Sequence, residues 1–166
     1  MTVDVYQIPS YFPTNDPANP GTAYTKITTV SFVPVLNSYF CDLVNDKAYR
    51  VMQVLSSKDL DRAIVVTVPQ TISVKNIFFI PGEHPTSTVD IFANVYGQVT
   101  SPPGNPGGYG LINSPNFVPP IGSFYYQTDR TRTYQITDVL YAIGEDRAIV
   151  LAVPSAQDAA DIFALT

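Results

Sequence analysis

Apolar and polar residues alternate with a period of two along several stretches of the chain, as expected for half-buried β-strands. Residues 25–33, 47–55 and 132–140 follow this pattern and are rich in β-branched and aromatic side chains. Residues 63–68 (AIVVTV) and 148–153 (AIVLAV) are instead apolar runs, which are typical of strands covered on both faces. We therefore predict a mainly β protein in which these two runs form central strands.

Four prolines bear on where the predicted strands end, because proline has no N–H group to donate to a neighbouring strand. Pro69 and Pro154 directly follow the two apolar runs and are expected to end those strands. Pro34 and Pro119 fall inside stretches that otherwise resemble strands. The second pair therefore indicates an edge position or a bulge.

The pattern changes at the end of the chain. In residues 154–166, Ala159, Ile162 and Phe163 recur at helical spacing, and Ser155 is a suitable N-cap. We predict a short C-terminal helix there. The matching residues 69–80 have more β-branched side chains and are compatible with either a helix or a strand.

The first and second halves of the sequence resemble each other along most of their length. Residues 61–69 (DRAIVVTVP) and 146–154 (DRAIVLAVP) are identical at seven of nine positions, and their offset is 146 − 61 = 85. Residues 3–6 (VDVY) and 89–92 (VDIF) correspond at an offset of 86, and the one-residue difference falls in a loop rich in proline and glycine. One register kept over this length predicts a tandem duplication.

The predicted copies are residues 1–82 and 87–166, joined by a linker over residues 81–88. A unit of this size buries only about 60% of the surface that its unfolded chain exposes. We therefore expect the copies to share an interface around a pseudo-twofold axis. The predicted fold class is mainly β, with two small antiparallel β-sandwich or barrel-like modules and the short C-terminal helix. A single intertwined sandwich that exchanges strands between the copies is the alternative.

Charge and composition limit the classes of partner. The chain of 166 residues has 9 basic against 14 acidic side chains, and its net charge of −5 disfavours nucleic acid. No apolar run reaches the length of a membrane span, and the first ten residues do not resemble a signal peptide. Cys41 is the single cysteine, which suits a reducing compartment. We expect a cytoplasmic or otherwise non-secreted protein, and a virion or an inclusion would also fit.

The inventory of reactive side chains favours few kinds of chemistry. One histidine (His84, beside the proline of the linker) and one cysteine cannot form a zinc site of the usual composition, and we predict no cofactor. A Ser-His-Asp site would have to use His84 of that linker, which disfavours a hydrolase of this kind. Paired carboxylates in two predicted hairpin connections offer a weak calcium site, although charged turns are the simpler interpretation: Asp59, Asp61, Glu145 and Asp146.

Tyrosines and asparagines gather in and beside the two loops rich in proline and glycine. Tyrosine combines a rigid apolar face with a polar tip, and asparagine amides can bind hydroxyl groups. These residues are our candidate ligand-binding residues, and packing of the loops onto the sheet is the alternative interpretation: Tyr11, Asn19, Tyr24, Tyr96, Asn105 and Tyr109.

Three functional hypotheses remain. The first is a non-catalytic, lectin-like binding module whose two equivalent loop sites recognise a glycan or a protein surface, with avidity from the two sites. The second is a structural or assembly protein (a capsid, coat or inclusion component), for which low lysine content and many prolines suit ordered packing, and which would be a homo-oligomer. The third is a metal-free enzyme with a pocket between the copies.

Overall fold

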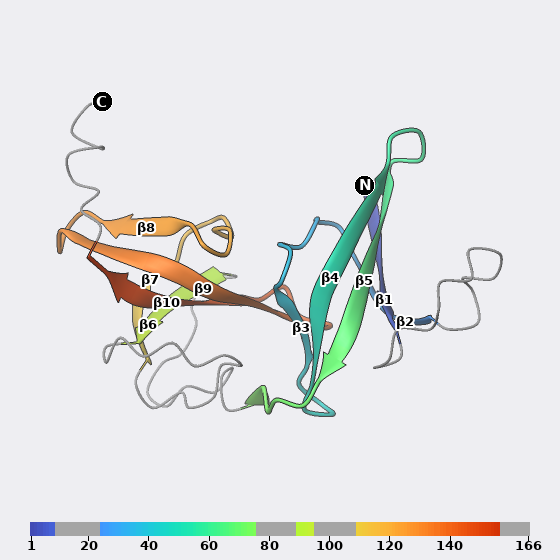
Figure 1. Cartoon of the computed structure of the whole chain (residues 1–166), viewed down its shortest axis with the longest axis horizontal. Helices are drawn as coiled ribbons and strands as arrows, with labels where there is room; N and C mark the ends of the chain where they lie inside the picture. The colour runs from blue at the N-terminus through green and yellow to red at the C-terminus, as the bar shows by residue number, and fades with distance from the viewer. Residues whose placement is uncertain (9–23, 76–88, 95–108, 157–166) are drawn as a thin grey trace.

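The computed structural model describes residues 1–8, 24–75, 89–94 and 109–156, and the elements that these residues form are β-strands, with helical backbone only at Lys75 (Figure 1). Ten strands lie in this part of the chain. They are β1 (Thr2–Gln7), β2 (Thr25–Val30), β3 (Tyr39–Asp42), β4 (Lys47–Ser57), β5 (Arg62–Gln70), β6 (Val89–Asn94), β7 (Tyr109–Asn113), β8 (Phe124–Gln127), β9 (Arg132–Ala142) and β10 (Ala148–Ser155). The mainly β prediction is confirmed.

All ten strands belong to one mixed sheet. The order is β2-β1-β5-β4-β3-β9-β10-β6-β7, and β8 pairs with β9 beside this path. Three neighbouring pairs are parallel, namely β1 with β5, β6 with β10, and β3 with β9. The prediction of purely antiparallel modules is therefore wrong, because β1 and β6 pair with strands distant in sequence, and a local pattern of apolar residues does not specify such partners.

The first half of the sheet (β1–β5) and the second half (β6–β10) have the same internal order. It is β2-β1-β5-β4-β3 in the first half and β7-β6-β10-β9-β8 in the second. The registers also correspond: Val54 faces Val65, and Val139 faces Val150, with both members offset by 85. Even the irregularity in β4, where Met52 is passed over, recurs in β9 at offset 85.

The two apolar runs form β5 and β10, and each is the middle strand of its half, as predicted. Pro69 and Pro154 do not end these strands, however, since they face Tyr49 and Tyr134 in the ladders. Proline is tolerated there because the pairing of β5 with β1 stops at Thr67 and that of β10 with β6 at Ala152, so no neighbouring strand among the described residues needs the missing N–H group.

Two further local predictions are corrected. Pro34 and Pro119 lie in irregular segments ahead of β3 and β8 and not within strands. Ser155, the predicted N-cap, ends β10 opposite Thr133, and the remainder of the predicted helix (157–166) lies outside the described residues. The linker over residues 81–88 also lies outside them, so the domain boundaries stay predictions.

The core runs through both halves. The larger cluster of buried side chains includes Val5 and Val65 from the first half and Ile136 and Val150 from the second. Phe40, in the strand between the halves, belongs to the same cluster. The halves therefore share buried apolar surface where they meet.

Candidate functional site: the joint between the two halves

A single short strand joins the two halves. β3 pairs antiparallel with β4 of its own half and parallel with the end of β9 in the other half. Tyr39 faces Leu140 and Phe40 faces Tyr141 across this joint, and the backbone N–H of Ile143 donates to the carbonyl oxygen of Cys41 at 2.9 Å. The first half thus adds a strand to an edge of the second half, which is the geometry by which β-proteins bind extended segments.

Aromatic rings pack over this joint from both halves. The ring centroid of Tyr141 lies 4.9 Å from that of Phe32 and 5.4 Å from that of Phe40. The backbone N–H of Val35 donates to the Tyr141 hydroxyl at 3.3 Å. Burial is the main influence on this phenol and raises its pKa. The Tyr141 side chain therefore connects the segment ahead of β3 to the second half through a ring contact and a hydrogen bond.

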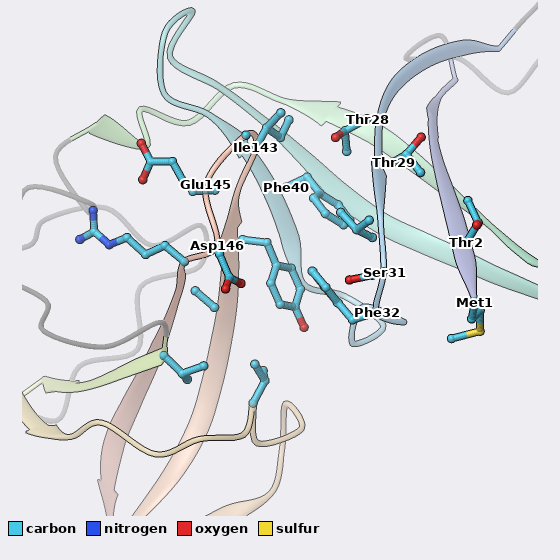
Figure 2. A pocket seen from close by; sticks show the side chains of 18 residues that line it. Met1, Thr2, Thr28, Thr29, Ser31, Phe32, Phe40, Ile143, Glu145 and Asp146 are labelled. Atoms are coloured by element: carbon cyan, nitrogen blue, oxygen red, sulfur yellow. The ribbon is translucent and has the colours of Figure 1, made fainter.

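A cleft of about 680 Å³ lies beside the joint (Figure 2). Phe32, Phe40 and Tyr141 contribute apolar surface to it, while Glu145 and Asp146 come from the β9–β10 hairpin. Threonine and serine hydroxyls line the side formed by the first half: Thr2, Thr28, Thr29 and Ser31. Such a lining can bind a polar chain or a protein segment.

Two other groups near the joint have shifted pKa values. Burial raises the pKa of the Asp138 carboxyl, against smaller lowering effects from the hydrogen bond of Thr137 and the charge of Arg50, but Asp138 does not line the cleft. Burial also lowers the pKa of Arg147, which does line it. Asp138, the buried carboxyl whose pKa is raised, is therefore not placed to act as an acid or base on a ligand in the cleft.

A buried carboxylate organises the outer strands of the first half. Asp4, in the middle of β1, forms ion pairs with Lys26 (2.6 Å) and Arg62 (2.6 Å) and accepts a hydrogen bond from the Thr29 hydroxyl (3.0 Å). The bonds from Lys26, then Arg62 and Thr29, lower the pKa of Asp4 from 3.8 to about 2. Asp4 therefore connects β1 to β2 and β5 through charge as well as through backbone pairing.

The second half repeats this arrangement in part. Asp90 is fully buried in β6, accepts a hydrogen bond from the Ser114 hydroxyl (2.6 Å), and lies near enough to Arg147 to affect its pKa. Sequence reasoning missed this pair of carboxylates. An aspartate inside an apolar strand in both VDVY and VDIF was the available signal, because a buried charge requires a partner.

Acid should remove the stabilisation that Asp4 provides. The folded-state pKa of about 2 is below the ordinary value of 3.8, so this contribution is complete above about pH 4 and is lost as the pH falls towards about 2. We expect urea midpoints of the parent protein to fall over that range and those of the Asp4→Asn variant to fall less. Asp42 and Asp46, whose pKa values are also lowered, retain the rest of the dependence. Equal slopes for the two proteins would contradict this assignment.

The structure describes only two of the six predicted ligand-binding residues, Tyr24 and Tyr109. Tyr11, Asn19, Tyr96 and Asn105 lie outside the described residues. Tyr24 is half-buried directly ahead of β2, and Tyr109 begins β7 and packs against the smaller core cluster. Strands β2 and β7 are at opposite ends of the sheet, so these two tyrosines are not brought together.

The four candidate calcium ligands are not brought together either. Asp59 and Asp61 lie in the exposed β4–β5 turn, whereas Glu145 and Asp146 lie in the β9–β10 turn. No group of three or more histidine, cysteine or acidic side chains suited to a metal occurs among the described residues. Arg62, which follows the β4–β5 turn, binds Asp4 of the neighbouring strand β1 through its guanidinium.

Three remaining sequence predictions concern single residues and membranes. Cys41 is fully buried in β3 and burial raises the pKa of its thiol, so it is a packed core residue. His84 lies outside the described residues. Within the ranges that the structure describes, no helix has the length and hydropathy needed to cross a membrane.

Comparisons with protein-family models, with curated proteins and with solved structures found no match to this chain.

Proposed function

We propose that this protein is a structural or assembly protein that acts through contacts between β-strand edges. The observation that carries the proposal is the parallel pairing of β3 with β9, by which one half of the chain already binds the other half. An exposed strand edge offers unpaired N–H and C=O groups, so a sheet built in this way can extend by adding strands from another chain.

We also propose a tandem duplication, which would explain the evolutionary origin of this joint. The equal strand order and registers of the two halves, together with the 85-residue offset in sequence, support it. If the ancestral unit was a single half, a contact between separate subunits became the internal joint after fusion. The joint is also heterologous, since β3 of one half meets β9 of the other and not its own counterpart β8.

Binding through the tyrosine-rich loops is a weaker candidate. Tyr109 is partly used in packing, and the two described tyrosines lie on opposite edges of the sheet. The pocket between the halves exists, as the enzymatic hypothesis requires, but the carboxyl whose pKa burial raises, Asp138, is not part of it. The geometry of the strand edges therefore favours assembly over both alternatives.

Sedimentation velocity and light scattering of the full chain test the proposal. We expect the average mass to rise with concentration well before the solubility limit. A mass that stays at that of the monomer, 18.2 kDa, over the whole range would overturn the assembly function. High salt should have little effect on the rise, because backbone pairing and apolar contact, unlike exposed ion pairs, are only weakly screened.

A further inference from the structure

We propose that chains associate head to tail, with β8 of one chain pairing with the end of β4 in the next chain. The inference rests on the proposed assembly function and specifies its interface and its partner, a second copy of this chain. The contact repeats between chains the arrangement that joins β3 to β9 within one chain.

The correspondence between the four strands defines the register. β8 lies at an offset of 85 from β3, and each pairs in the same way with its own half: Phe40 faces Tyr49, and Tyr125 faces Tyr134. β9 lies at the same offset from β4. Transferring the joint by this offset places Phe124 opposite Leu55 of the next chain.

Burial at these matched positions supports the assignment. At the joint, Tyr39 is 5% exposed and Leu140 is fully buried. Their counterparts at the free edges, Phe124 and Leu55, are 44% and 53% exposed. Large apolar side chains on an unpaired strand edge are unfavourable in an isolated molecule, and a second copy would cover them as the joint covers their counterparts.

In the part of the chain that the structure describes, no further strand pairs with either of these two edges. Among the described residues, β8 pairs only with β9, and on the side of β4 that faces β3 backbone pairing extends no further than Val51. In Figure 1, β8 lies on the outer side of β9, and the β4–β5 hairpin extends beyond the end of β3. The two edges differ, so their pairing is heterologous and produces a closed ring or an open filament.

Two polar residues that lie close together at the joint are both replaced at the corresponding positions of the proposed contact. At the joint, Arg50 is close enough to Asp138 to lower the pKa of that carboxyl, although burial has the larger, opposite effect. The counterparts at offset 85 are Gln135 and Gln53, which are both exposed. An acid–base pair is thus replaced by two amides that can bind each other, and no charge is left without a partner.

The hydrogen bond from Val35 to Tyr141 has no counterpart at the proposed contact, because both of its partners are different residues there. The counterpart of Val35 is Pro120, which has no N–H group, and the counterpart of Tyr141 is Ser56, which has no phenol. The donor and the phenol are lost together, so the absence of this hydrogen bond leaves neither of its two groups unpaired, but the contact between chains buries less aromatic surface. It should therefore be weaker than the joint and depend on concentration.

Two single variants of the full chain test this contact, each with a lysine on one edge: Phe124→Lys on β8 and Leu55→Lys on β4. A lysine on a strand edge opposes pairing, and both side chains are exposed, so the fold should be retained. Each variant alone should lose the rise in mass with concentration. An equimolar mixture should form a species of twice the monomer mass and nothing larger, because one unmodified edge remains on each chain.

Val44→Lys is the matched control, because Val44 is 86% exposed and lies in the β3–β4 turn away from both edges. This variant should assemble like the parent, and thermal melts should show that all three variants stay folded. If the parent assembles but the two edge variants also do, or if their mixture stays monomeric, the interface is wrong while the assembly function stands. A parent that never assembles would instead overturn the function itself.

Discussion

Replacing Leu140 by alanine is expected to lower the free energy of unfolding by about 2–5 kcal/mol. Leu140 is fully buried at the joint, where it faces Tyr39 and packs in the smaller core cluster with Phe92 and Leu151. Truncation removes apolar contacts and leaves a cavity that a β-sheet, held by its ladders, can only partly close. Urea unfolding at concentrations where the protein is monomeric measures the effect.

Leu55→Ala is the matched control for this experiment. Leu55 occupies the corresponding position at offset 85 but is 53% exposed, so its truncation should change the free energy of unfolding by no more than about 0.5 kcal/mol. The two substitutions are chemically identical but differ in surroundings, because Leu140 is covered by Tyr39 of the other half as well as by Phe92 and Leu151 of its own, whereas Leu55 is exposed. Equal losses would show that the joint does not stabilise the fold.

Replacing Tyr141 by serine, the residue at the corresponding position in the first half, should cost about 3–5 kcal/mol. The substitution removes a ring that contacts Phe32 and Phe40 and the hydroxyl that accepts a hydrogen bond from Val35. Tyr141→Phe keeps the ring and should cost only about 1 kcal/mol, the net value of one hydrogen bond.

A double-mutant cycle then shows whether Tyr141 acts across the joint. Tyr141→Ser and Phe32→Ala should be non-additive, because the two rings contact each other and lie in different halves of the molecule. Additive losses in urea unfolding would mean that the rings stabilise their own halves separately. The same cycle with Leu60→Ala, which is exposed in the β4–β5 turn, should be additive.

We expect the proposed contact between chains to be weaker than the internal joint, for reasons visible in individual side chains. Tyr141 completes an aromatic cluster at the joint, whereas its counterpart Ser56 cannot. A permanent internal contact and a weaker, reversible external one suit a protein that is stable as a monomer and assembles at high concentration.

Much of the architecture could be predicted from local patterns. The strands over residues 47–57 and 132–142 and the central strands at 62–70 and 148–155 were recognisable because alternation and apolar runs report burial on one or two faces. The positions of Pro69 and Pro154 inside their strands were not. Whether proline is tolerated depends on the neighbouring strand, and in β5 the pairing with β1 has already ended.

The candidate site was less accessible to prediction. The tyrosines of the loops attracted attention because of their composition, whereas Asp4 and Asp90 were overlooked although each interrupts an apolar strand. The joint itself had no local signal. Tyr39 and Phe124 are both aromatic residues in matching segments, and nothing in those segments says that only the first is covered.

By itself, the sequence determined the β class and the strands that lie at the centre of each half, because these depend on side-chain periodicity. Only the tertiary structure decided that the halves form one mixed sheet joined by β3 and β9, and that Leu140 is buried while Leu55 is exposed. Pairing between strands distant in sequence depends on contacts across the whole folded molecule and not on any local stretch of its sequence.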